Sequence, residues 1–193
     1  MPLPDTVKLD PRVAGLASEM RAWRRHLHAH PETAFEEHET AAFVAERLRD
    51  FGLSPVVGVA GTGVVASLTG RRPGTRAIAL RADMDALHVR EENDFEHRSR
   101  NAGRMHACGH DGHTAMLLGA ARALSEEPDF AGTVHFVFQP AEENEGGGRA
   151  MLEDGLFERF PTDAVFGMHN WPGLPVGRMA MKPGAMMGGF DTF

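Results

Sequence analysis

The sequence predicts an α/β fold in three layers, in which a largely parallel sheet is flanked by helices, and three observations support this prediction. Short apolar runs bounded by glycine are typical of strands. Longer stretches repeat apolar residues every three or four positions, as amphipathic helices do. The two kinds of segment alternate along the second half of the chain, which favours parallel strands joined by crossover helices.

Two helices are predicted first, one over residues 12–29 and one ending at Gly52. The apolar face of the first helix consists of Val13, Leu16, Met20 and Leu27. The apolar face of the second consists of Ala41, Val44, Leu48 and Phe51. Pro31 would stop the first helix because proline lacks the amide hydrogen that a helix needs, and Gly52 would cap the second in a left-handed conformation.

Four strands and two more helices follow along the chain. The strands are predicted over residues 63–68, 77–82, 133–138 and 163–168. The helices are predicted over residues 113–126 and 149–158. Open α/β sheets carry their reactive groups beyond the carboxyl ends of the strands, so a functional site is expected at those ends.

Composition narrows the classes of protein that this chain can represent. Its 193 residues are enough for one domain with a packed core. The net charge of -7 argues against nucleic-acid binding, which needs a basic patch. No stretch approaches the roughly 20 apolar residues of a membrane span. The first residues do not form a signal peptide, which predicts a cytoplasmic protein.

The single cysteine excludes an internal disulfide and fits a reducing compartment. Cys108 could be a small buried apolar group, a nucleophile or a metal ligand. It lies in residues 105–113, MHACGHDGH, where three histidines and one aspartate surround it. Thiolate and imidazole are preferred ligands of zinc and its neighbours, and Gly109 would let Cys108 and His110 face one ion. The alternative is a helix-capping loop with exposed histidines and a buried thiol. His106 and His113 are expected behind the ligands or at the surface.

Residues 139–148, QPAEENEGGG, place three carboxylates after a predicted strand. Successive side chains of extended backbone point in opposite directions, so Glu142 and Glu143 could serve different purposes. One could bind a metal while the other takes a proton from water. The alternative is that these residues face water or favour the start of the next helix through its dipole. Glu145 is expected to be solvated.

Three other groups are weaker candidates. His169 follows the last predicted strand, and such a histidine alone is more often structural. Asp83 and Asp85 follow another strand and could orient a ligand histidine from behind, or they could cap a loop. Residues 24–30, RRHLHAH, are interpreted as the solvated face of the first helix, because alternate histidines do not share a helical face.

These motifs, in this order, resemble the amidohydrolases that include hippurate hydrolase, N-acyl-amino-acid amidohydrolases and the plant indoleacetyl-amino-acid hydrolases, which are relatives of aminoacylases and metallo-carboxypeptidases. The resemblance is carried by RRHLH at 24–28 with Pro31 and Glu32, RADMDAL at 81–87, MHACGHD at 105–111, QPAEE at 139–143 and GMHN at 167–170. The resemblance implies a zinc-peptidase-like catalytic domain.

The resemblance also implies two divalent ions, for which zinc, manganese, cobalt and nickel are all suitable. It assigns metal binding to Cys108, which would bridge the ions, to His110 and His169 on the first ion, and to Glu143 on the second. Glu142 would be the general base. Independently of the resemblance, Asp83 and Asp111 are expected to support the ligands from behind. Water activated by the metals would attack the amide of an N-acyl amino acid, such as a hippurate-like or N-acetyl substrate, and Glu142 would pass the proton to the leaving amine.

Two departures from the family pattern matter. His88 stands where relatives usually have proline, which would alter a turn. The chain ends at Phe193, so residues 1–185 correspond to the N-terminal segment of the catalytic domain and residues 186–193 to the start of an inserted dimerisation domain. A further metal-binding histidine of relatives would lie beyond that point, and the sheet edge would be unpaired.

Three functions therefore stay open. The first is the amidohydrolase, whose full-length form the resemblance predicts to be a homodimer or homotetramer that binds neither nucleic acid nor membrane. The second is a truncated metal-binding fragment without independent activity. The third is a dipeptidase or carboxypeptidase of the same superfamily.

Overall fold

The computed structural model describes residues 10–143 and 145–186. Its helices are α1 (Pro11–Gly15), α2 (Ala17–Ala29), α3 (His38–Asp50), α4 (His110–Glu126), α5 (Gly147–Glu153) and α6 (Leu156–Arg159). Its strands are β1 (Val56–Val59), β2 (Gly63–Thr69), β3 (Arg72–Asp83), β4 (Ala131–Gln139) and β5 (Ala164–Gly167). Residues 187–193, which make up most of the predicted start of an inserted domain, lie outside the described residues.

The five strands form one sheet in the order β1-β2-β4-β3-β5. Strand β3 runs parallel to β4 and to β5, whereas β2 is antiparallel to both β1 and β4. In the parallel part, Asp83 pairs with Gln139 and Arg81 pairs with Gly167. The carboxyl ends of β3, β4 and β5 therefore meet at one edge of the sheet, where the sequence places its polar motifs.

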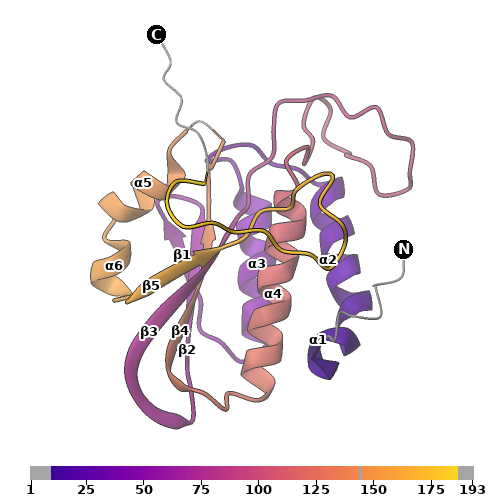
Figure 1. The fold of residues 1–193 in the computed structure, drawn as a ribbon. Helices are drawn as coiled ribbons and strands as arrows, with labels where there is room; N and C mark the ends of the chain where they lie inside the picture. The colour runs from indigo at the N-terminus through magenta and orange to yellow at the C-terminus, as the bar shows by residue number, and fades with distance from the viewer. Residues whose placement is uncertain (1–9, 144, 187–193) are drawn as a thin grey trace.

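Helices cover both faces of the sheet, which confirms the predicted three-layer α/β fold. Helices α2, α3 and α4 lie on one face, and the short helices α5 and α6 lie on the other (Figure 1). Strand β5 forms one edge of the sheet, and Val165 and Phe166 on it are 51% and 56% exposed. In the described part of the chain, no helix is long and apolar enough to span a bilayer.

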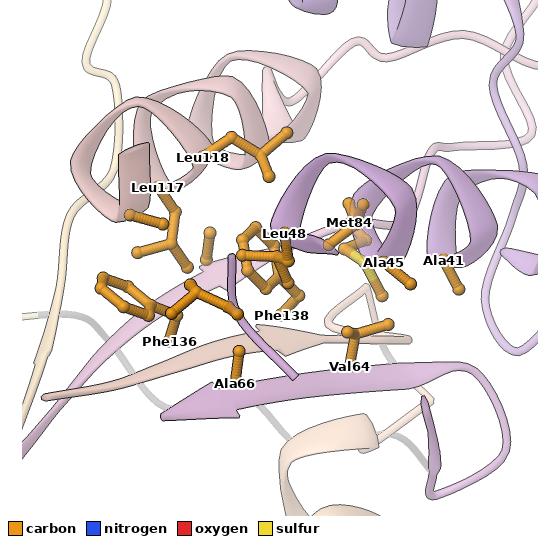
Figure 2. Close-up of a cluster of buried hydrophobic side chains, with 14 of the residues drawn as sticks. Ala41, Ala45, Leu48, Val64, Ala66, Met84, Leu117, Leu118, Phe136 and Phe138 are labelled. Atoms are coloured by element: carbon orange, nitrogen blue, oxygen red, sulfur yellow. The ribbon is translucent and has the colours of Figure 1, made fainter. Parts of the chain in front are cut away.

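The larger core lies between the sheet and the helices α3 and α4 (Figure 2). Phe136 and Phe138 of β4 point into it and are fully buried beside Leu48 and Leu118. Val137, between the two phenylalanines, points to the opposite face and packs in the smaller core that α5 and α6 cover. Burying one such large side chain contributes about 1.5–3 kcal/mol, so β4 anchors both layers and fixes where its carboxyl end lies.

The observed elements differ from the predicted ones in several places. The helix predicted over residues 12–29 is divided at Leu16, whose amide donates to the carbonyl of Val13 in a tight turn. The helix predicted over 149–158 is divided by Gly155, whose φ of +79° is left-handed and stops α5. Strand β1 was not predicted, because it is short and half exposed. Helix α4 begins at His110 instead of residue 113, which brings that histidine into the first helical turn.

Candidate metal centre

Side chains able to bind a metal converge at the carboxyl ends of β3, β4 and β5 and at the start of α4. Among the described residues, three groups place one potential ligand atom from each member within 4.8 Å of the others. The groups are Cys108 with His110 and His169, His110 with Glu142 and Glu143, and Asp83 with His110 and His113. His110 belongs to all three groups, so it lies at the centre of the site.

His110 is fully buried, and its orientation is fixed by one hydrogen bond. Its Nδ1 lies 3.2 Å from Oδ1 of Asp85, so the hydrogen of the neutral ring is held on Nδ1 and the lone pair on Nε2. That Nε2 lies 3.7 Å from Oε1 of Glu143 and 3.9 Å from Oε2 of Glu142. Burial opposes protonation of His110, but Asp85 and the other carboxylates outweigh it and raise its pKa.

Nε2 of His110 and Oε1 of Glu143 are both buried and have no hydrogen-bond partner among the described residues. An unsatisfied buried polar atom costs about 1–3 kcal/mol, so two of them facing each other need an explanation. Two ligands of one divalent ion, each about 2 Å from it, lie about 3–4 Å apart. The separation of 3.7 Å therefore fits a divalent ion bound between these atoms.

Cys108 and His169 form the other part of the site. Sγ of Cys108 lies 3.3 Å from Nε2 of His169, which follows β5. Gly109, between Cys108 and His110, has a φ of +93°, and a Cβ on it would lie 2.5 Å from the Asn170 side chain. Burial and the carboxylates of Glu143 and Glu142 raise the pKa of Cys108 to about 12. A thiolate at this position therefore requires neighbouring cations.

Glu142 and Glu143 lie in a turn after β4 whose backbone is held on both sides. Ala141 has a φ of +51°, which is uncommon for a residue with a Cβ. Its amide donates to Oε1 of the fully buried Glu37 at 2.8 Å, and the other oxygen of Glu37 accepts from the Thr62 hydroxyl. The Glu143 amide donates to Oδ2 of Asp85 at 2.9 Å. Burial and the charge of Glu143 raise the pKa of Glu142.

The two aspartates at the carboxyl end of β3, Asp83 in the strand and Asp85 after it, have different partners. Asp85 contacts both His110 and the Glu143 backbone, so one carboxylate links two candidate ligands. Asp83 accepts from Nδ1 of His113 at 2.6 Å and from Arg81 at 2.7 Å. Burial opposes ionisation of Asp83, but these partners outweigh it and lower its pKa to about 2. Asp83 therefore lies 3.7 Å from Nε2 of His110 without holding that ring.

His113 links Asp83 to the end of β5. Because its Nδ1 donates to Asp83, its Nε2 is an acceptor, and it receives the amide hydrogen of Asn170 at 3.0 Å. This bond fixes the backbone directly after His169. The sequence identified His113 only as a group behind the ligands or at the surface, and the structure buries it.

This combination of thiol, imidazoles and paired carboxylates accompanies a clear family match. Residues 79–186 match the model of peptidase family M20/M25/M40. The chain belongs to this family. The resemblance predicted from the five motifs is confirmed, because the M20 match includes most of the site and the curated relatives carry the expected names.

The relatives of this M20 chain are longer than it is. An N-acyl-L-amino acid amidohydrolase of Geobacillus stearothermophilus is 48% identical over 91% of this chain and 47% of its own length. Hippurate hydrolase of Campylobacter jejuni is 43% identical over 97% of this chain and 48% of its own. The chain thus spans about half the length of the curated relatives it matches.

A solved structure of an M20 protein matches the fold closely. The YXEP protein of Bacillus subtilis, described as a dinuclear metal-binding peptidase, superposes with a TM-score of 0.80 at 42% identity. The match covers 85% of this chain and 46% of that protein. In this chain, the group of Cys108, His110 and His169 and the group of His110, Glu142 and Glu143 overlap at His110.

Asp111 lies away from the ligands of this M20 site. Its Oδ2 lies 2.8 Å from Nδ1 of His28 and accepts from Arg24 at 3.2 Å. In residues 10–143 and 145–186 it makes no hydrogen bond to a candidate ligand side chain. The prediction that residues 24–30 form a solvated helix face is wrong for His28, which is 7% exposed because Asp111 and Glu91 cover it.

The histidines of residues 105–113 are buried, which excludes the alternative of a capping loop with exposed histidines. His106, His110 and His113 are 5%, 0% and 3% exposed, so they do not face solvent. Burial lowers the pKa of His106 to about 4, which keeps this ring neutral. Glu145 is exposed, as predicted. Glu37 and Thr62 had no signal in the sequence, because their partner in the site is 104 residues away from Glu37 along the chain.

Proposed function

We propose that this protein is a metal-dependent amidohydrolase that cleaves the amide bond of N-acyl amino acids, either hippurate-like or N-acetyl substrates. The observation that carries the proposal is the pair of unpartnered atoms on His110 and Glu143, which face each other beside Glu142. The substrate class is supported by the relatives named for N-acyl amino acids and hippurate, which share 48% and 43% identity with this chain.

The proposed site holds two divalent ions. Cys108 would bridge them, His110 and His169 would complete the ligands of the first, and Glu143 would bind the second. Zinc, manganese, cobalt and nickel all accept this mixture of thiolate, imidazole and carboxylate. When bound, such ions polarise an amide carbonyl and make water more acidic.

Glu142 is the proposed general base. It is 40% exposed, so water and substrate reach its carboxylate. It takes a proton from the attacking water and returns it to the nitrogen of the leaving amino acid. A carboxylate with a raised pKa performs both steps better at neutral pH than an ordinary one, because its affinity for the proton is closer to the ambient pH.

Buried carboxylates hold these groups in place. Asp85 orients His110 and the turn that carries Glu143. We assign Asp83 a less direct role, which is to hold His113 and through it the backbone beside His169. Asp111 supports the first turn of α4 by binding His28 and Arg24.

The partner is a small-molecule N-acyl amino acid, and the full-length protein is a homodimer or homotetramer in the cytoplasm that binds neither nucleic acid nor membrane. A peptidase activity on dipeptides is the second candidate, favoured by the description of the YXEP protein as a peptidase.

A turnover assay on N-benzoyl and N-acetyl amino acids and on dipeptides, with metal analysis of the same samples, tests the proposal. Glu142→Gln should keep its metal and lose a factor of about 10² to 10⁴ in turnover, because a general base contributes that much. Glu145→Gln, an exposed change in the same turn, should behave like the unaltered chain. Turnover by Glu142→Gln near the unaltered rate would exclude Glu142 as the base.

A further inference from the structure

One face of helix α2 carries a row of positively charged side chains outside the metal centre. Arg21, Arg24, Arg25 and His28 occupy positions that are three, four and seven residues apart. Residues at these spacings are neighbours on a helix surface. Like charges placed four residues apart weaken a helix, so this row favours a compensating group of opposite charge.

This row lines a cavity of about 390 Å³, together with Phe95, His97 and Asp111. Phe95 and His97 lie in the loop between β3 and α4, which passes beside one end of α2 (Figure 1). Their rings are stacked, with centroids 4.2 Å apart and an angle of 16° between the planes. The cavity therefore has a cationic wall on the helix and a flat aromatic wall on the loop.

Among the described residues, the carboxylates near the cavity pair with Arg24 and His28 but leave Arg21 and Arg25 uncompensated. Asp111 binds Arg24 and His28 through one oxygen, and Glu91 binds the other nitrogen of His28. Within residues 10–143 and 145–186, no carboxylate forms an ion pair with Arg21 or Arg25. Burial, followed by the charges of Arg25, His28 and Arg24, lowers the pKa of His97, which agrees with an excess of positive charge.

An arginine row that only faces water is the plainer explanation for these residues. The rings of Phe95 and His97 pack beside His28, at centroid distances of 5.6 and 5.9 Å, yet Phe95 stays 37% exposed, which a row that only faces water does not explain. Guanidinium groups match carboxylate and phosphate oxygens in pairs, and aromatic rings stack on flat ligands. We propose that this cavity binds an organic anion in which a carboxylate or phosphate group is attached to a flat aromatic ring.

The cavity is separate from the proposed metal centre, because none of its lining residues is a candidate ligand or the proposed base. Asp111 is the nearest link between the two, since it follows His110 in the first turn of α4. The binding proposal therefore does not depend on metal content or turnover. It can be tested on protein treated with a chelator, so failure of the amidohydrolase proposal leaves its test unaffected.

Isothermal titration with four probes tests the two chemical features separately. Benzoate and phenyl phosphate carry a ring, whereas acetate and inorganic phosphate do not, so the pairs also distinguish a carboxylate from a phosphate ligand. We expect one ring-bearing probe to bind at least about tenfold more tightly than its partner without a ring. Equal binding within both pairs would overturn the aromatic part of the proposal.

Variants locate the binding. The double change Arg21→Gln with Arg25→Gln should weaken binding of the preferred probe about tenfold, because it removes two charge-assisted contacts. It leaves the Arg24 and His28 contacts with Asp111 in place. Arg49→Gln, at an exposed arginine of α3, is the matched control and should bind like the unaltered chain. Binding by the double variant that equals the control, or no binding of any probe, would overturn the proposal.

Discussion

The two sides of the metal centre are built differently. On the side of β3 and α4, His110, Asp83 and Asp85 are 0–1% exposed, and each is held by hydrogen bonds to other buried groups. On the side of β5, His169 is exposed, and Nδ1 of its ring hydrogen-bonds to the carbonyl of Asn170, the next residue. The first side is part of the core of the domain, whereas the second is attached to an edge strand.

Substitutions on the buried side should therefore affect both folding stability and the site, whereas substitutions on the exposed side should affect the site alone. Removing a polar group from the buried side leaves its partners without hydrogen bonds, so stability and the proposed metal binding should change together. Removing the exposed side chain leaves few unpaired groups, so the proposed metal binding should change alone. A hydrogen bond from the Asn170 amide to Nε2 of His113 connects the two sides.

Asp85→Ala should have the largest effect on stability. It leaves Nδ1 of His110 and the amide of Glu143 without their shared buried acceptor. We expect the free energy of unfolding to fall by about 3 kcal/mol, which is typical when one member of a buried charged network is removed. Urea denaturation of protein treated with a chelator measures the change. A loss below about 1 kcal/mol would mean that the buried side is not built as described.

Glu37→Ala should have the next largest effect, because it removes the acceptor that holds the left-handed turn at Ala141. We expect a loss of about 2 kcal/mol from the unpaired amide and the unpaired Thr62 hydroxyl. Thr62→Val is the matched variant, since it removes only the hydroxyl and should cost less. If both variants unfold at the same urea concentration as the unaltered chain, Glu37 does not support the turn.

A smaller, pH-dependent effect is expected at His28. Hydrogen bonding to Asp111 raises the pKa of His28 despite its burial. A raised pKa in the folded state adds stability that is fully present below the ordinary histidine pKa of about 6.5 and is lost as the pH rises through the folded value. Relative to His28→Gln, the unaltered chain should therefore lose stability as the pH rises above about 6.5. Parallel stability curves for the two proteins would contradict this assignment.

His169→Ala should have the smallest effect on stability, within about 0.5 kcal/mol in protein without metal, because exposed substitutions rarely cost more. Its affinity for divalent ions should nevertheless fall, since the variant lacks one proposed ligand. Thermal unfolding with and without added zinc separates the two effects. A large loss of stability without metal would remove the contrast between the two sides of the site.

The sequence predicted the parts of this molecule that depend on local pattern. Apolar periodicity identified the strands β2 to β5 and the main helices, and residue chemistry identified the polar clusters after β3 and β4. It did not assign Asp83 and Asp85 to different histidines, because that depends on how α4 packs against the end of β3. The sequence predicted His28 to be exposed, because the residues that bury it, Glu91 and Asp111, lie 63 and 83 positions away along the chain.

The central claim is that Cys108, His110, Glu143 and His169 bind divalent metal together, and a cobalt titration followed by absorption spectroscopy tests it most directly. A cobalt ion bound by thiolate gives an intense ligand-to-metal absorption that imidazole and carboxylate do not give. We expect this band to saturate at a whole number of ions per chain and to be lost in Cys108→Ala. No stoichiometric binding, or the same band and stoichiometry in Cys108→Ala, would contradict the account.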